Sequence, residues 1–143
     1  MSPASPFHET LVRVRYAETD QMGVAHHSAY IVYFELGRTD MMRAHGLSYA
    51  RMERRGILLA VAEVGLKYRA PARFDETLRV RTRLTEVGRV RVQFDYEILR
   101  ENEEVVCTGF TVLACVDRDL RPRRLPEEEQ GRMLSLCRLL AKE

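Results

Sequence analysis

Residues 28–45, SAYIVYFELGRTDMMRAH, are the stretch that is most informative about the fold of this chain. Their length suits a helix, and the first part, AYIVYF (29–34), is apolar on nearly every side of one. An ordinary surface helix has a polar face, so this helix should be covered all round. Gly46 follows, at a position where glycine often ends a helix. The stretch therefore predicts one long buried helix.

Strand patterns flank this helix on both sides. Residues 10–16 alternate, with Val12, Val14 and Tyr16 on one face, which predicts a half-buried strand. The remaining expected elements are a short helix over 47–55, strands over 57–68, 77–87, 90–98 and 105–116, and a last helix over 126–141. A run of antiparallel strands after one buried helix indicates an α+β domain, with the sheet wrapped around that helix.

Length and composition narrow the class of protein. The 143 residues fit one domain of roughly 100–200 residues, so we expect a loose end over 1–6 and a single domain over 7–143. A net charge of +2 and no aromatic stacking pattern argue against a nucleic-acid partner. No apolar run approaches the ~20 residues that cross a bilayer, and the first residues lack the features of a secretory signal. We therefore expect a cytoplasmic protein with no membrane insertion.

Metal-ligating residues follow no recognised spacing. The three cysteines, Cys107, Cys115 and Cys137, match no zinc or redox pattern and are predicted to be reduced, buried thiols. Adjacent histidines, His26 and His27, point in different directions at a helix start and make a poor metal pair. The sequence predicts no metal site.

The segment between the first strand and the long helix, AETDQMGVAHH (17–27), holds the polar residues that look out of place. Asp20 precedes a loop containing Gly23, and the loop runs into the N-terminus of the buried helix. The unpaired N–H groups and partial positive charge of a helix N-terminus favour a developing oxyanion. A nearby carboxylate could act on a bound carbonyl as nucleophile or general base. On spacing alone, however, the favoured interpretation is that Asp20 caps the helix or its own loop.

A family resemblance rests on the same stretch. VRVRYAETDQMGVAHHSAYIVYFELGRTDMMRAHG (12–46) resembles the opening signature of the 4-hydroxybenzoyl-CoA thioesterase family, and looks closest to its Tol–Pal-associated acyl-CoA thioesterase subgroup. KYRAPARFDE (67–76) and CVDRDLRPRRLP (115–126) fit that subgroup in type and position. The matching pieces of the first stretch are Tyr16, Thr19–Asp20, Gly23, His27, Tyr30 and Tyr33–Phe34–Glu35.

The resemblance implies a hotdog fold and hydrolysis of an acyl-CoA thioester to a carboxylic acid and free coenzyme A. It assigns the catalytic carboxylate to Asp20 and the polarising N–H to the backbone of His27, with Gly23 in the same motif. It also brings the side chains of His27 and Tyr16 into the site, although each could instead be structural. Whether Asp20 attacks directly or activates water stays open.

Substrate contacts are expected from three parts of the chain. The resemblance places nucleotide-binding arginines at Arg89, in a hairpin, and at Arg121 and Arg123, after the last strand. Arginine forks suit the phosphates of coenzyme A. From face and position, the acyl pocket is expected to include Tyr30, Phe34, Val61 and Val64, with Glu35 as a supporting candidate. No cofactor is expected, because coenzyme A is part of the substrate.

The long helix is too apolar for one copy of the chain to cover, which points to self-association. The resemblance implies dimers assembled into tetramers, with each site at a subunit boundary. Other functions stay open: a hotdog hydratase or dehydratase, or a non-catalytic module that binds acyl-CoA or an acyl carrier protein. The acyl group, short, long or aromatic, and its carrier are also open.

Overall fold

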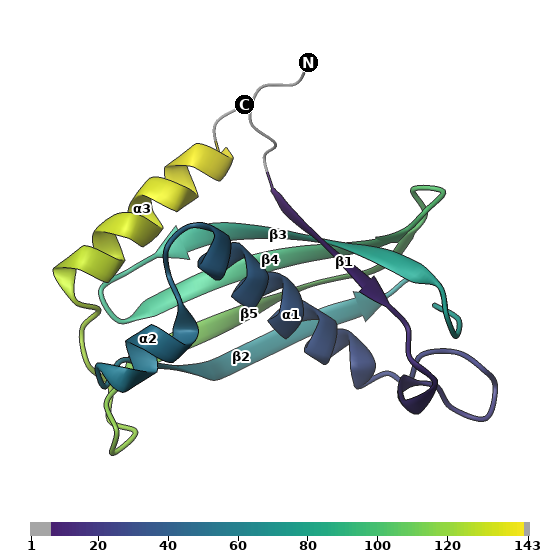
Figure 1. The fold of residues 1–143 in the computed structure, drawn as a ribbon, viewed down its shortest axis with the longest axis horizontal. Coiled ribbons are helices and arrows are strands. Elements are labelled where there is room, and N and C mark those ends of the chain that lie inside the picture. Colours follow the sequence, from purple (N-terminus) through teal and green to yellow (C-terminus); the bar gives the residue numbers. More distant parts are fainter. Residues whose placement is uncertain (1–6, 142–143) are drawn as a thin grey trace.

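The computed structural model describes residues 7–141, with side chains described through Cys137 (Figure 1). The expected loose end over 1–6 and the side chain of Leu140, in the predicted last helix, lie outside this description. The elements are β1 (His8–Arg13), a short 3-10 turn (Tyr16–Glu18), α1 (Ala29–Ala44), α2 (Tyr49–Arg54), β2 (Leu58–Tyr68), β3 (Thr77–Val87), β4 (Arg91–Arg100), β5 (Val105–Val116) and α3 (Glu127–Ala141).

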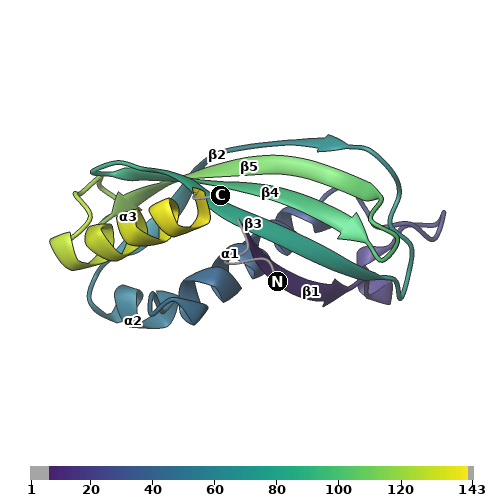
Figure 2. The ribbon, with the colours of Figure 1, turned by 90° about the horizontal axis from the view of Figure 1, so that it is seen from above.

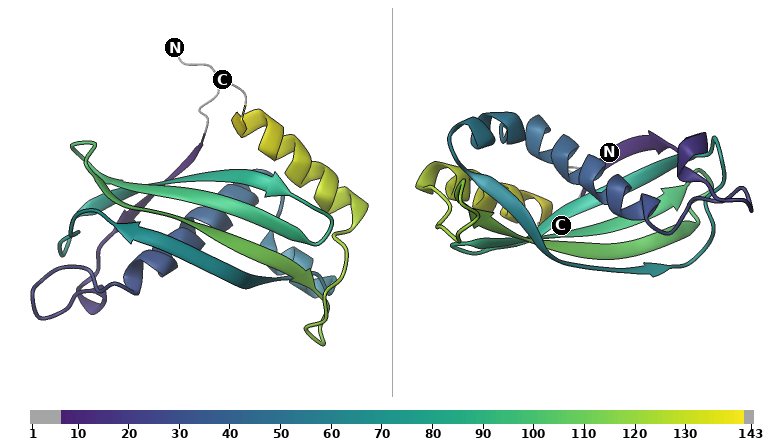
Figure 3. Two further views of the ribbon diagram at one scale, coloured as in Figure 1. Left: turned by 180° about the vertical axis from the view of Figure 1, so that it is seen from behind. Right: turned by 90° about the horizontal axis from the view of Figure 1, so that it is seen from below.

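All five strands form one antiparallel sheet in the order β1-β3-β4-β5-β2, so β1 and β2 are its edges. The three helices lie on the same side of the sheet (Figure 2). Seen from behind, the other face carries no helix of residues 7–141 (Figure 3). The predicted α+β architecture, with a sheet around one long helix and a terminal helix, is confirmed.

The buried side of α1 builds the core, and its other side is open. Tyr33, Phe34, Met41 and Met42 are at most 1% exposed and face the sheet. Three apolar side chains on the other side, Ile31, Val32 and Leu36, are 41%, 44% and 45% exposed. The prediction that this helix is covered all round is therefore wrong for a single chain, because the sheet reaches only one side of it.

The first strand is displaced from its predicted position. β1 ends at Arg13, and the alternation holds through buried Val14, but Tyr16 is 78% exposed rather than on the inner face. The cause lies two residues further on, where the side chain of Glu18 accepts a hydrogen bond from the backbone N–H of Arg15 at 2.9 Å. That bond closes a turn and takes Tyr16 out of the strand.

The cysteines are free thiols, as predicted. Cys107 and Cys115 are buried on β5, whereas Cys137 on α3 is only partly buried. Burial raises the pKa of Cys107 to about 12, so its thiol stays protonated. None of the helices in the described part of the chain is long and apolar enough to cross a bilayer.

Asp40 on α1 forms hydrogen bonds with the edge strand β1, and its contribution to the stability of the fold depends on pH. Its carboxylate lies 3.0 Å from His8 Nε2 and accepts a hydrogen bond from Thr10 Oγ1 at 2.7 Å. The hydrogen bond from His8, with that from Thr10, holds the pKa of Asp40 below its usual value of 3.8. The stabilisation is therefore present above pH 3.8 and is lost as the pH falls through the lowered pKa.

Asp40→Asn is expected to reduce the free energy of unfolding by up to about 1 kcal/mol at pH 7, the upper range for a solvent-exposed ion pair. Denaturant unfolding of both proteins as a function of pH measures this difference. It should shrink as the pH falls below 3.8. A difference that stayed constant with pH would show that the carboxylate charge is not what joins β1 to α1.

Candidate functional site

Asp20 occupies a tight loop that precedes α1. Its backbone N–H donates to Val24 O at 2.9 Å, and its carbonyl accepts from Gly23 N at 3.0 Å. Its Oδ1 accepts a hydrogen bond from Met22 N at 2.9 Å, so the carboxylate closes its own turn. Gly23 has φ +78, a left-handed conformation that glycine adopts without strain. The loop thus holds a half-buried carboxylate in a defined orientation, which agrees with both the capping and the chemical interpretation.

Just before the N-terminus of α1, one backbone N–H beside this loop, that of His27, is unpaired among the described residues, whereas Ser28 N donates to His26 Nδ1 at 3.3 Å. Ser28, the capping residue, makes no hydrogen bond from its side chain to the helix backbone. His26 N donates to Glu18 O at 2.7 Å and Ala29 N donates to His26 O at 2.9 Å, but within residues 7–141 the structure records no acceptor for His27 N. A free N–H at the positive end of a 16-residue helix is a suitable donor to a carbonyl oxygen.

The side chain of His27 is exposed, and its ring lies against that of His26 with centroids 4.0 Å apart. Its carbonyl oxygen accepts a hydrogen bond from the hydroxyl of Tyr68 at 2.9 Å. In the described part of the chain, no group of three or more His, Cys, Asp or Glu side chains is arranged to hold a metal ion.

Tyr16 belongs to the same loop, but its ring points elsewhere. It packs edge-on against Phe74, with ring centroids 5.5 Å apart, and both residues are more than half exposed. The backbone N–H of Phe74 donates to Gly23 O at 3.3 Å, which places this aromatic pair at the rim of the Asp20 loop. Tyr16 therefore lies near the loop entrance rather than in the core.

Three residues outside the predicted site position this loop. The Tyr33 hydroxyl donates to Glu18 Oε1 at 2.8 Å, which joins the 3-10 turn to α1. Partial burial of Glu18 acts to raise its pKa, but hydrogen bonds from Arg15 and Tyr33 outweigh this and the pKa is lowered. Tyr68 holds the His27 carbonyl from β2. Tyr33 and Tyr68 lie within motif stretches, yet sequence spacing gives no signal that their hydroxyls meet this loop.

Two of the expected pocket residues are core residues here. Tyr30 is 3% exposed and its hydroxyl accepts a hydrogen bond from Ala72 N at 3.3 Å. Phe34 is fully buried and stacks on Tyr96, with ring centroids 4.2 Å apart at an angle of 8°. Both rings are therefore packed in the core and do not border an open surface in a single chain.

Glu35 on α1 and Val61 and Val64 on β2 are exposed. β2 runs antiparallel to α1, because Tyr68 contacts His27 at one end, whereas the Tyr49 hydroxyl donates to Leu59 O at 3.4 Å at the other. The two valines therefore lie between these ends, on the strand beside the helix. They remain candidates for an apolar wall.

The three candidate phosphate-binding arginines lie at the other end of the molecule. Arg89 O accepts a hydrogen bond from Leu125 N at 2.7 Å, which joins the β3–β4 turn to the loop that carries Arg121 and Arg123. This loop lies near α2, whereas the Asp20 loop lies at the far end of α1 (Figure 1). A helix of 16 residues is ~24 Å long, so one chain does not bring these arginines and Asp20 together.

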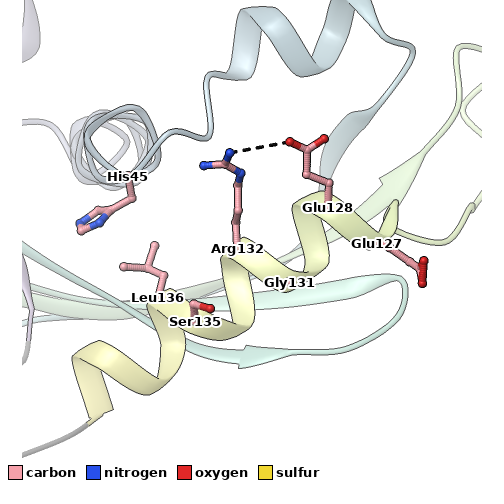
Figure 4. Close-up of a pocket in the computed structure, with 7 residues that line it drawn as sticks. All are labelled: His45, Glu127, Glu128, Gly131, Arg132, Ser135 and Leu136. Atoms are coloured by element: carbon pink, nitrogen blue, oxygen red, sulfur yellow. Dashed lines mark ion pairs between the residues drawn. The ribbon is translucent and has the colours of Figure 1, made fainter.

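A separate pocket of about 530 Å3 lies between the end of α1 and α3 (Figure 4). His45 borders it on one side, and on α3 Arg132 forms an ion pair with Glu128 at 3.7 Å. Because His45 follows the C-terminus of α1 and Asp20 precedes its N-terminus, this pocket is not part of the Asp20 site.

Comparisons with known proteins identify the family. A model described as the thioesterase-like superfamily matches residues 14–134. The putative acyl-CoA thioesterase YneP of Bacillus subtilis is 33% identical over 108 residues, which cover 76% of this chain and 78% of that protein. The acyl-CoA thioester hydrolase YbgC of Escherichia coli is 31% identical over 117 residues, covering 81% and 87% respectively.

Similar solved structures point to the same family as the sequence comparisons. The hypothetical protein TT1821 from Thermus thermophilus is 45% identical with a TM-score of 0.86, and the match covers 90% of this chain and 98% of that one. The DHNA-CoA thioesterase from Staphylococcus aureus is 35% identical with a TM-score of 0.86, covering 90% and 89%. The predicted hotdog fold and the predicted enzyme class, a thioester hydrolase, are confirmed at the level of the family. The chain belongs to the thioesterase-like superfamily.

Proposed function

We propose that this enzyme hydrolyses an acyl-CoA thioester to a carboxylic acid and free coenzyme A. One observation carries the proposal: a fixed carboxylate, Asp20, and a free N–H, that of His27, lie in one short loop at the positive end of α1. A thioester carbonyl bound there would have its oxygen near the N–H. The names of YneP and YbgC support the same reaction class.

Under this proposal the C–S bond of the thioester is replaced by a C–O bond to an oxygen that comes from water. The His27 N–H and the helix N-terminus stabilise the negative charge that develops on the carbonyl oxygen. Asp20 either activates water or attacks the carbonyl itself to form an anhydride that water then opens. The C–S bond breaks, the sulfur leaves as thiolate and takes up a proton, and water supplies the new carboxyl oxygen. No cofactor enters these steps.

The reaction is tested by release of free thiol from acyl-CoAs, with aliphatic chains from short to long and with aromatic acyl groups. Thiol release supports a thioesterase. Saturable binding without release would favour the non-catalytic binder, and chemical change of an intact thioester would favour the hydratase or dehydratase. The length profile would also test the resemblance to the Tol–Pal-associated subgroup and the choice between aliphatic and aromatic acyl groups. Matched acyl carrier protein thioesters would identify the carrier.

A second copy of the chain would complete the site. Edge strand β2 is exposed beside the apolar side of α1, and unpaired edge strands readily pair with another chain. If two β2 strands paired antiparallel, the α2 end of one copy would lie beside the Asp20 end of the other. The second copy would then bring Arg89, Arg121 and Arg123 towards the substrate phosphates. We therefore propose a cytoplasmic homo-oligomer built from such dimers, with tetramers as their assembly.

Val61→Lys is expected to convert the oligomer to monomers and to abolish most thiol release, because a charge at an edge strand blocks pairing. Val61 is 53% exposed on β2. Leu11→Lys is the matched control, since Leu11 is 65% exposed on the opposite edge strand β1. Sedimentation velocity measures the mass of both variants. A Val61→Lys protein that kept the wild-type mass would exclude pairing through β2.

A further inference from the structure

Arg38 is a buried cation that has no carboxylate partner among the described residues. It is 6% exposed on α1, and its Nη1 donates to the hydroxyl of Tyr96 at 3.2 Å. That hydroxyl in turn lies 2.6 Å from the Oγ1 of Thr111. Within the described residues no carboxylate lies within 4 Å of the guanidinium, and Arg38 Nε is buried with no hydrogen-bond partner. Because arginine stays protonated, the chain holds an incompletely satisfied positive charge in its interior.

Arg38 is one of the residues that line a pocket of about 360 Å3. Its walls combine two carboxylates, two hydroxyls and one apolar side chain with Arg38: Glu35, Thr39, Tyr49, Glu53 and Leu59. Burial raises the pKa of Tyr49 to about 12, so its hydroxyl stays protonated at neutral pH. Arg38 is buried and supplies hydrogen-bond donors on the inner side of the pocket, whereas Glu35 and Glu53 are exposed and supply carboxylate acceptors at its rim.

The pocket continues the line that starts at the Asp20 loop. His27, Ile31, Glu35 and Arg38 are spaced by four, four and three residues, so they follow one side of α1. The eleven residues from His27 to Arg38 correspond to ~16 Å along the helix axis. On the other side of this line, β2 runs from Tyr68 beside His27 to Leu59 at the pocket. A chain laid between α1 and β2 from the thioester would end at Arg38.

We propose that the Arg38 pocket binds a hydroxyl group near the far end of the acyl chain, and thereby selects hydroxylated acyl substrates of medium to long chain length. This inference rests on the proposed function, because it takes the thioester to lie at His27. A hydroxyl can accept a hydrogen bond from the guanidinium of Arg38 and donate one to Glu35 or Glu53. A terminal methyl group would leave the cation unpaired. A terminal carboxylate would meet two carboxylates at the rim.

The test compares three acyl-CoAs of equal chain length that end in a methyl, a hydroxyl or a carboxylate group, with free-thiol release as the readout. The hydroxylated thioester should have a kcat/KM on the order of 10- to 100-fold above the other two, since a site built to bind a hydroxyl discriminates against analogues that lack it. Arg38→Met should remove this preference while hydrolysis of the methyl-ended thioester continues. Replacing a buried charge with an apolar side chain of similar volume is often tolerated.

Tyr49→Phe and Glu35→Gln provide variants that need no change at the buried cation, and each should reduce the preference in part. A further measurement uses only the wild-type protein: the free hydroxy acid should inhibit at a lower concentration than the unsubstituted acid. Circular dichroism confirms that each variant is folded. If Arg38→Met does not fold, the substrate preference of Tyr49→Phe and Glu35→Gln and the inhibition of the wild type by the free acids decide the inference.

Equal kcat/KM values for the three thioesters would overturn the inference, and so would a preference for the carboxylate-ended chain. If no thioester releases thiol, the proposed function fails instead. In that case calorimetric binding of the same three thioesters still tests the pocket, and tighter binding of the hydroxylated one would support it. Equal binding would overturn it.

Discussion

Asp20→Asn is expected to lower kcat for thiol release by a factor on the order of 10²–10⁴, the usual contribution of a positioned acid–base group. The structure makes this a sharp test, because asparagine can still accept the hydrogen bond from Met22 N that closes the loop. The variant therefore removes the carboxylate charge and leaves the turn. Thiol-release assays at saturating substrate measure kcat, and denaturant unfolding curves show separately whether the stability has changed.

Asp95→Asn is the matched control. Asp95 is also a half-buried aspartate that accepts hydrogen bonds from neighbouring side chains, but it lies on β4, where it faces away from the helices. Its loss should leave thiol release within about twofold of the wild type. An Asp20→Asn protein with wild-type kcat would eliminate Asp20 from the chemistry and leave it as a loop cap.

The two routes open to Asp20 differ in where the oxygen of water goes. If the carboxylate attacks the thioester, water opening the anhydride at its aspartyl carbonyl places labelled oxygen in Asp20 over many turnovers. If Asp20 activates water, the label enters only the product acid. Mass spectrometry of the protein after reaction in labelled water distinguishes these outcomes. Label in Asp20 would identify it as the nucleophile.

Phe34→Ala is expected to lower the free energy of unfolding by about 3–5 kcal/mol, the cost of removing a large aromatic side chain from a packed core. Phe34 is 0% exposed and stacks on Tyr96. Its ring also occupies the space above Gly109, where a Cβ would approach Phe34 Cζ to 2.7 Å. Truncation to alanine would leave a cavity between Tyr96 and Gly109, and denaturant unfolding measures the resulting loss.

Leu11→Ala serves as the comparison for this stability measurement. Leu11 is apolar but 65% exposed on β1, so its truncation should change stability by no more than about 0.5 kcal/mol. If Phe34→Ala lost as little as Leu11→Ala, Phe34 would not be part of the core. A normal stability combined with an altered acyl-chain preference would restore Phe34 to the pocket, where the sequence had placed it.

Much of the fold follows from local pattern. The apolar run 29–34 and the alternation over 77–87 and 90–98 predict elements that the structure has to within a residue or two. Such patterns suffice because burial of one face is a local property of period 3.6 or 2. Tyr16 is the exception. The alternation predicts that Tyr16 is buried, but the hydrogen bond from Arg15 N to Glu18 ends the strand before it, and hydrophobic periodicity gives no signal for such a bond.

The pattern of residues along the chain predicts the α+β class, the long central helix and Asp20 as a candidate, whereas His27 is a candidate through the resemblance of residues 12–46 to a known family. Which distant groups meet is set by the fold and not by local pattern. The fold joins Tyr68 to the carbonyl of His27, separates Arg121 from Asp20 by the length of α1, and buries Arg38 beside Tyr96 with no carboxylate of the described residues within 4 Å. These contacts depend on the order of strands in the sheet and on which side of α1 faces it, and residue spacing contains neither.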